Sequence, residues 1–138
     1  MTARRSQHVK LFEKLADQRF EEAEFLFNKS PYTTVTAYLA GYAVECILKA
    51  LLLSRTPVSR QQKLFDSFRG GKAHNFEWLK NELRKKKVAW PAELARSFKT
   101  VSQWSTEWRY KAGRIPPREA DAFLKATSEL LQWAKGSI

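Results

Sequence analysis

Two charged side chains interrupt the most apolar stretch of the 138-residue sequence, and their spacing could support chemistry. The stretch Val35–Leu53 contains Glu45 and Lys49 as its charged residues. Being four residues apart, they fall on the same side of an α-helix. One interpretation is an ordinary surface ion pair, which contributes little to stability. The other is a polar seam in a cleft flanked by Tyr38 and Tyr42, because a solvated face normally carries more than two charges.

A second set of candidate residues combines cations with aromatic rings. It consists of Trp104, Trp108, Arg109, Tyr110, Lys111, Arg114 and Arg118. Cations neutralise phosphates and exposed rings stack on bases, a combination that holds single-stranded nucleic acid. Arg109 and Arg114 are therefore expected to contact phosphate. Trp104 and Tyr110 would stack on a base or shape the pocket. The segment 84–87 is also basic, but cations at a helix C-terminus suit the helix dipole without any ligand.

The sequence gives little support to metal or nucleophile chemistry. It contains two histidines, His8 and His74, and one cysteine, Cys46. These residues make no credible metal site, and a single thiol cannot form an intrachain disulfide. Gly70 and Gly71 are too short a run to cradle a phosphate and follow no expected strand. We therefore expect neither a metal nor another cofactor, and the lone thiol favours a reducing compartment.

The overall charge favours an anionic partner. The chain has 25 Lys and Arg against 14 Asp and Glu, a formal net charge of +11. RNA or a nucleotide is the expected partner, although the charge could also serve solubility alone. The segment Thr2–Gln7 is polar and basic, unlike a signal peptide. In a bilayer, Glu45 and Lys49 would each cost roughly 2.5–3.5 kcal/mol. We expect a cytoplasmic protein without a membrane span.

The elements that position these residues are expected to be helices. Apolar residues recur at three- and four-residue steps in five segments, approximately 7–28, 31–54, 75–86, 91–108 and 117–134. Ser30 is the expected N-cap of the second helix, with Pro31 at its first position. The segment Thr56–Ala73 is expected to be a polar connection with at most a short helical turn. No repeat or linker divides the chain, so residues 1–138 are predicted to form a single all-α, up-and-down bundle.

The second predicted helix also suggests a homodimer. Its apolar side chains cover nearly the full circle, with Leu39, Ala43 and Cys46 on one side and Val44 and Leu48 opposite. A helix that is apolar all round is buried all round. In a small bundle, such a helix must be central or must have its outer face covered by a second copy of the chain. We therefore expect the chain to dimerise.

The segment Tyr38–Leu51, YLAGYAVECILKAL, resembles the second-helix signature of the HEPN family. Ala16–Leu26 is similar to the first helix of the family, and His74–Leu79 to the start of its third. Trp108–Tyr110, followed by a Gly and Pro break, resembles its C-terminal part. The likeness extends from Ala16 to Trp133. It implies a helical bundle that dimerises and is often encoded beside a nucleotidyltransferase-type partner; the chain also resembles the helical substrate-binding domain of such enzymes.

Many HEPN proteins are metal-independent RNases of toxin–antitoxin and defence systems, and the resemblance implies a motif of Arg followed closely by His. Arg109 matches the Arg, but Arg114, Ile115 and Pro116 stand where the His is expected. None of these is a general acid–base group near neutral pH. His74 is the candidate substitute, although a histidine there often caps a helix or simply packs.

Three functions follow as hypotheses. The leading one is a dimeric HEPN-like subunit that binds RNA or a nucleotide, or docks a nucleotidyltransferase, without efficient cleavage. Its ligand site would include the phosphate and stacking residues named above, with Glu45 and Lys49 lining the cleft. The second is an RNase toxin that uses Arg109 and His74. The third is a non-catalytic structural interaction protein.

Overall fold

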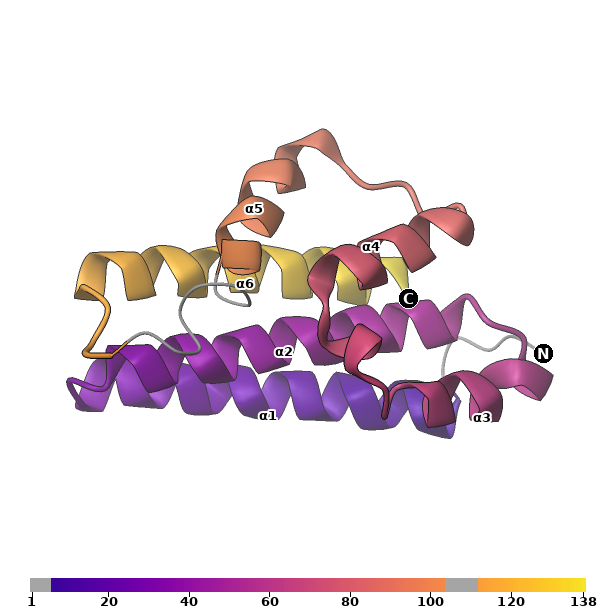
Figure 1. Cartoon of the computed structure of the whole chain (residues 1–138), viewed down its shortest axis with the longest axis horizontal. Helices are drawn as coiled ribbons and strands as arrows, with labels where there is room; N and C mark the ends of the chain where they lie inside the picture. Colours follow the sequence, from indigo (N-terminus) through magenta and orange to yellow (C-terminus); the bar gives the residue numbers. More distant parts are fainter. Residues whose placement is uncertain (1–5, 104–111) are drawn as a thin grey trace.

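The computed structural model describes residues 6–103 and 112–138, and this part of the chain is helical without any strand (Figure 1). Its α-helices are α1 (Gln7–Lys29), α2 (Thr33–Ser54), α3 (Val58–Ser67), α4 (Phe76–Lys85), α5 (Ala95–Gln103) and α6 (Pro117–Ser137). Two short 3-10 helices, η1 (Gly71–His74) and η2 (Ala92–Leu94), precede α4 and α5. The predicted all-α bundle is confirmed.

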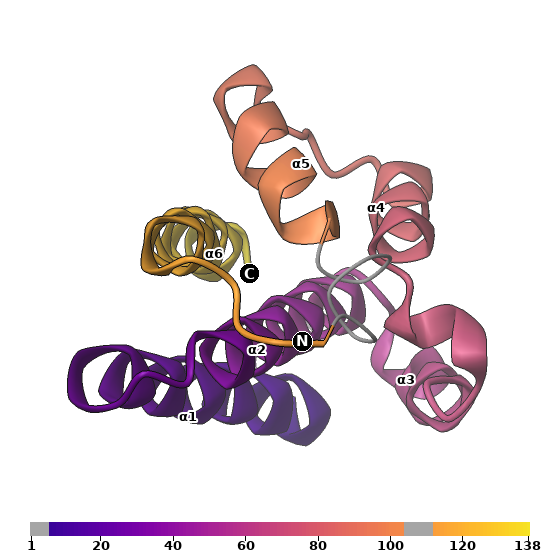
Figure 2. The ribbon, with the colours of Figure 1, turned by 60° about the vertical axis from the view of Figure 1, so that its left-hand side comes forward.

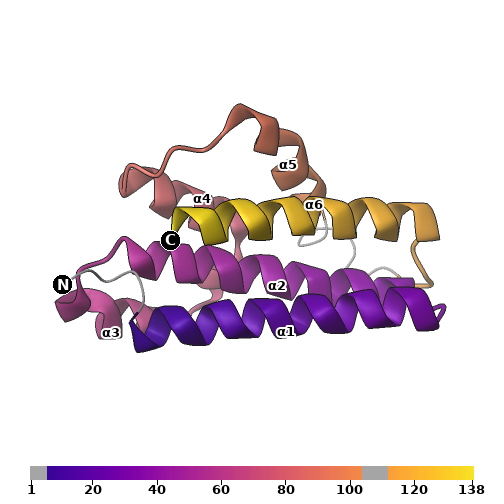
Figure 3. The same ribbon diagram turned by 180° about the vertical axis from the view of Figure 1, so that it is seen from behind.

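Three long helices, α1, α2 and α6, lie side by side and form the body of the bundle (Figure 3). Helices α1 and α2 form an antiparallel hairpin, whereas α2 and α6 run parallel. At their starts, Thr33 Oγ1 donates to the Ile115 carbonyl at 2.5 Å. At their ends, Arg55 Nη2 donates to the Ser137 carbonyl at 2.6 Å. Because α2 and α6 are parallel, the chain must cross from the end of α2 back to the start of α6. Helices α3, α4 and α5 lie in an arc along this crossover (Figure 2).

The start of α2 differs from the prediction. Helix α2 begins at Thr33, with Tyr32 as its N-cap, rather than at Pro31 behind a Ser30 cap. Ser30 instead closes α1, because its Oγ donates to the Leu26 carbonyl at 2.7 Å. The hydroxyl satisfies one of the carbonyls left unpaired at a helix C-terminus. The serine therefore ends the first helix and does not open the second.

The segment Thr56–Ala73 is more ordered than predicted, because it contains the ten-residue helix α3. This helix is fixed by a buried glutamine, Gln61, which is 2% exposed. Its amide nitrogen donates to the carbonyls of Leu53, at 3.0 Å, and Thr56, at 3.2 Å. These carbonyls lie at and just beyond the end of α2, where intrahelical partners run out. A polar side chain therefore anchors α3, which explains why apolar periodicity did not reveal the helix.

The burial of α2 is uneven along its length. From Ala43 to Ser54 every residue except Glu45 is buried. The first half of the helix exposes a stripe that includes Val35, Tyr38 and Tyr42. The prediction of burial on all sides is thus right for the second half of the helix and wrong for the first.

In length and composition, α2 could cross a membrane, the one helix in the described parts of the chain of which this is true. The core helix of a soluble protein passes the same test, and 72% of its most apolar window is buried inside the bundle. This feature is therefore weak evidence for a membrane span.

Candidate functional site

Glu45 is the centre of a cluster of three charged or polar side chains. Lys49 Nζ lies 2.7 Å from Glu45 Oε2, and His74 Nδ1 lies 3.0 Å from the same oxygen. Lys49 follows Glu45 by one turn of α2, whereas His74 comes from η1. The residues on either side of the histidine hold η1 in place. Ala73 is buried, and Asn75 caps α4 by accepting a hydrogen bond from the Trp78 N–H at 3.0 Å. The fold thus joins three of the predicted site residues.

Lys49 belongs to the interior part of the cluster. Its side chain is 5% exposed, against 14% for Glu45. The ammonium nitrogen lies 5.1 Å from the ring centroid of Phe68 and 5.9 Å from that of Phe12. Aromatic faces and a carboxylate together satisfy this buried cation. The pair is therefore not a surface ion pair, and Lys49 is directed toward internal partners rather than toward a phosphate outside.

His74 forms the solvent side of the cluster. Its side chain is 50% exposed. Because an ionised carboxylate can only accept a hydrogen bond, the geometry assigns a proton to Nδ1. Nε2 has no hydrogen-bond partner within residues 6–103 and 112–138. A carboxylate that fixes one ring nitrogen and leaves the other open is suited to proton transfer or to binding an anion.

Tyr42 and Arg19 border the cluster. Burial raises the pKa of the Tyr42 phenol, and the nearby Cys46 and Glu45 raise it further. Arg19 on α1 acts in the opposite direction on this pKa, so its positive charge lies near the phenol. Arg19 Nε also lies 3.0 Å from Glu22 Oε1. Tyr42 is 42% exposed, so its phenol ring is open to solvent.

Cys46 is close to the cluster but is not a nucleophile. Burial, and secondarily the charge of Glu45, raises the pKa of its thiol to about 12. The thiol therefore stays protonated at physiological pH, and a protonated thiol is a poor nucleophile. The residue packs as a small buried hydrophobe.

Arg114 lies far from the cluster. Its guanidinium lies over the Tyr32 ring, 4.9 Å from the centroid, beside a cavity of about 410 Å³ at the start of α2. Glu45 is twelve residues beyond Thr33, which corresponds to about 18 Å along the helix axis. The other candidates, Trp104, Arg109 and Tyr110, lie outside the described residues.

The remaining candidate groups do not add a metal site. His8 stacks on Phe65 at 4.5 Å between centroids, and its Nε2 lies 3.2 Å from Gln62 Oε1, so it joins α1 to α3. In the part of the chain that the structure describes, no group of three His, Cys, Asp or Glu side chains is placed to hold a metal ion.

Sequence reasoning did not identify Phe12, Phe68 or Arg19 as neighbours of the site. Phe12 could have been found, because it lies on the apolar stripe of α1 and a buried lysine needs such a neighbour. Phe68 and Arg19 carry no local signal, since the tertiary packing of α1 and α3 on α2 brings them there.

Fold and site together define a small helical bundle with a polar cluster on its central helix. The family model of the HEPN domain matches residues 9–137, nearly the whole chain. The protein therefore belongs to the HEPN family, as the resemblance predicted. Comparison with curated proteins and with solved structures gave no match.

Proposed function

We propose that this HEPN protein is a homodimeric subunit that binds RNA, or a nucleotide, without cleaving it efficiently. HEPN domains are generally nucleotide- or RNA-binding or RNase-like. The observation that carries the proposal is the open Nε2 edge of His74, held by Glu45 beside Tyr42 and Arg19. We call this surface, defined by Arg19, Tyr42, Glu45 and His74, the α2 face.

The α2 face offers the contacts that a single strand of RNA requires. Tyr42 presents an exposed ring, and base–aromatic stacking contributes about 1–3 kcal/mol per base. Arg19 and His74 supply N–H donors for phosphate oxygens. The net charge of +11 would add salt-dependent attraction. The sequence predicts that Lys49 lines the cleft; in this proposal Lys49 instead holds Glu45 in place from the inside.

The dimer would form through an apolar patch farther along the α1–α2 hairpin. Phe25 is 63% exposed and Val35 is 48% exposed. Phe25, Leu26 and Leu39 form the apolar part of a hollow of about 690 Å³ whose rim also carries Gln18, Glu21 and Glu22. Val35 lies one helical turn from Leu39. Exposed apolar patches commonly mark protein contacts. In a twofold dimer each copy would cover the same patch on the other. A nucleotidyltransferase-type protein is the alternative occupant.

A cytoplasmic location is part of the proposal. The chain has one cysteine, Cys46, so it cannot form an intrachain disulfide, and this suits a reducing compartment. A role in a toxin–antitoxin or defence system rests on the family resemblance alone.

The Glu45–His74 pair favours an RNase as the second candidate function. An oriented imidazole with a free Nε2 is a suitable general acid–base group. Against efficient cleavage, Arg114, Ile115 and Pro116 occupy the positions of the family's motif histidine. His74 would have to replace it from a different part of the chain.

The test is an RNA-binding and cleavage assay with matched variants. Fluorescence anisotropy of a labelled single-stranded RNA would compare Tyr42→Ala with Tyr32→Ala, and His74→Ala with His8→Ala. We expect Tyr42→Ala to weaken binding by about tenfold, as one lost stacking contact would. Tyr32 and His8 are not part of the α2 face, so their variants should bind like the wild type.

The same proteins would be incubated with total RNA in EDTA. We expect no efficient cleavage. Cleavage that His74→Ala abolishes and His8→Ala retains would establish the RNase instead. The absence of RNA or nucleotide binding even at low salt would contradict both functions and favour a structural role.

A further inference from the structure

A groove between α3 and α4 contains three cations from two different helices. It has a volume of about 550 Å³, and its cations are Arg60 and Lys63 of α3 and Lys86, the C-cap of α4. We propose that this groove, here called the α3–α4 groove, holds phosphate groups of an RNA backbone. The inference rests on the RNA-binding role proposed above and adds a second contact surface to it.

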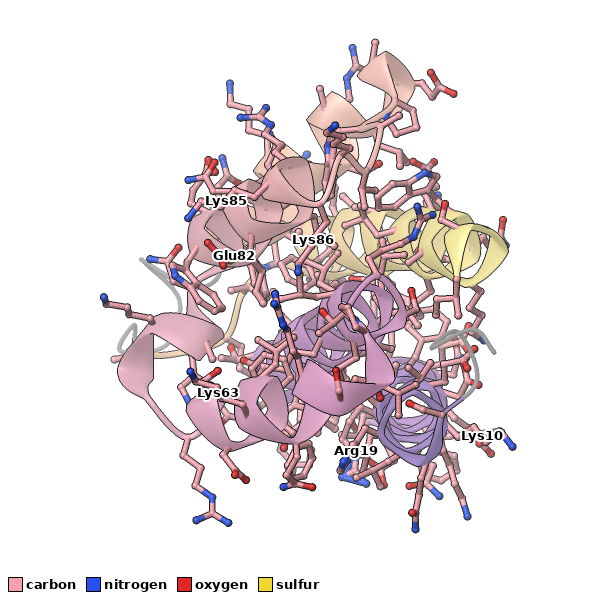
Figure 4. The ribbon with its side chains drawn as sticks, turned by 90° about the vertical axis from the view of Figure 1, so that its right-hand side faces the viewer. Lys10, Arg19, Lys63, Glu82, Lys85 and Lys86 are labelled. Carbon is pink, nitrogen blue, oxygen red and sulfur yellow. The ribbon has the colours of Figure 1, made fainter. Side chains whose placement is uncertain are left out.

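The charges of the α3–α4 groove are unbalanced. The side chains of Arg60, Lys63 and Lys86 make no ion pair, hydrogen bond or ring contact with any other described residue. Glu82 is the carboxylate of the groove within the described residues, and its Oε2 already lies 2.8 Å from Lys85 Nζ. Figure 4 shows Lys63 of α3 on the same face of the molecule as Lys85, Lys86 and Glu82. The groove therefore has a surplus of positive charge that an external anion would satisfy.

The exposure of these cations favours a long anion. All three are exposed and lie on flexible stems, whereas a site for one small ligand normally buries most of the ligand among positioned polar groups. Cations spread along an open groove suit a chain of regularly spaced charges. RNA carries one phosphate per nucleotide and fits this pattern.

The lining of the groove favours the sugar–phosphate backbone over the bases. Its apolar part is aliphatic, formed by the buried Leu52 and the partly buried Leu64, and none of the residues that line it is aromatic. Bases would find no ring on which to stack. The expected contact is therefore independent of sequence, in contrast to the stacking on Tyr42.

The groove also lies next to the α2 face. Ser67 lines the groove, and the next residue, Phe68, packs its ring against the Lys49 ammonium. Leu52 follows Lys49 by three residues, which is about 4.5 Å along α2. A strand bound in the groove would therefore lead toward the Glu45–His74 pair.

The test compares two triple variants with equal charge. The groove variant carries Arg60→Ala, Lys63→Ala and Lys86→Ala. The control carries Arg96→Ala, Lys99→Ala and Lys125→Ala, which are exposed residues of α5 and α6. Circular dichroism would show that both variants fold. The affinity for single-stranded RNA would then be measured over a range of KCl concentrations.

We expect the groove variant to lower the slope of log affinity against log salt by about 2, since each phosphate contact on a single strand contributes about 0.7. The control should keep the wild-type slope. Equal slopes for the two variants would overturn the groove site while leaving RNA binding by the α2 face intact. If the wild type bound no RNA, the groove inference and the proposed function would both be overturned.

A polyglutamate chain of equal charge tests whether the groove prefers an acidic protein. We expect polyglutamate to compete with RNA more weakly than unlabelled RNA does. Competition as strong as that of RNA, lost in the groove variant and retained in the control, would show an acidic protein partner and overturn the inference.

Discussion

The substitution Glu45→Gln tests whether the charged pair on α2 is an interior pair. It keeps the shape of the side chain but removes the negative charge beside Lys49, whose side chain is 5% exposed. Removing one partner of a buried ion pair typically costs about 3–5 kcal/mol, because the other charge remains buried without compensation. The rings of Phe12 and Phe68 would still contact the ammonium and offset about 1–2 kcal/mol of this. We therefore expect a loss of about 1–4 kcal/mol, centred near 2.5 kcal/mol.

Substitution of the partner residue, Lys49→Met, should lower the free energy of unfolding by less. Glu45 would keep its contact with His74, and its side chain is 14% exposed, so water can reach it. Methionine fits among the two phenylalanine rings, since thioethers pack well against aromatic groups. We expect a change of about 0–1 kcal/mol. The double variant Glu45→Gln/Lys49→Met has no lysine left without a partner. The stability of this variant should therefore lie within about 1 kcal/mol of that of the wild type.

Urea denaturation, followed by circular dichroism and tryptophan fluorescence, would measure these three values. The loss expected for Glu45→Gln corresponds to a fall in Tm of roughly 10 °C for a domain of this size. Two single variants that each change stability by less than about 0.5 kcal/mol, with additive effects, would show an ordinary surface pair. That result would refute the interior cluster and the role of Lys49 in holding Glu45.

Three further predictions concern the capping, the thiol and the assembly. Asn75→Ala should cost about 1 kcal/mol in urea denaturation, because the Trp78 N–H loses its cap; no change would contradict the cap. Cys46, with its thiol pKa raised to about 12, should react with a thiol reagent at neutral pH only after unfolding in urea, and rapid reaction of the folded protein would show an accessible thiolate. Val35→Glu should convert a dimer into a folded monomer in sedimentation experiments, and a persistent dimer would exclude the proposed patch.

Most of the helices could be predicted from apolar periodicity and capping residues. The spacing of Ala16, Phe20 and Ala23 defines α1, and Pro117 marks the first position of α6. Helix α3 could not be predicted in the same way. Its anchor, Gln61, is polar and is stabilised by carbonyls at the end of another helix, so a pattern of apolar residues does not contain it.

Only the part of the candidate site that lies on a single helix could be predicted from the sequence. The one-turn spacing of Glu45 and Lys49 indicates a pair, because it depends on a single helix. The contact between Glu45 and His74 joins residues 29 positions apart, and it depends on where the crossover places η1. The separation of Arg114 from the cluster has the same kind of cause. The parallel packing of α6 on α2 places Arg114 at the start of α2. This packing joins segments far apart in the chain, so the residues of α2 or of α6 alone do not indicate it.

An NMR titration of isotopically labelled protein with single-stranded RNA tests the central claim most directly. We predict that chemical shifts change at Arg19, Tyr42 and His74 on the α2 face, and that the exposed surface of α5 and α6 around Lys99 and Lys125 stays unaffected. Changes confined to that α5–α6 surface, or no change at all at low salt, would contradict RNA binding by the α2 face.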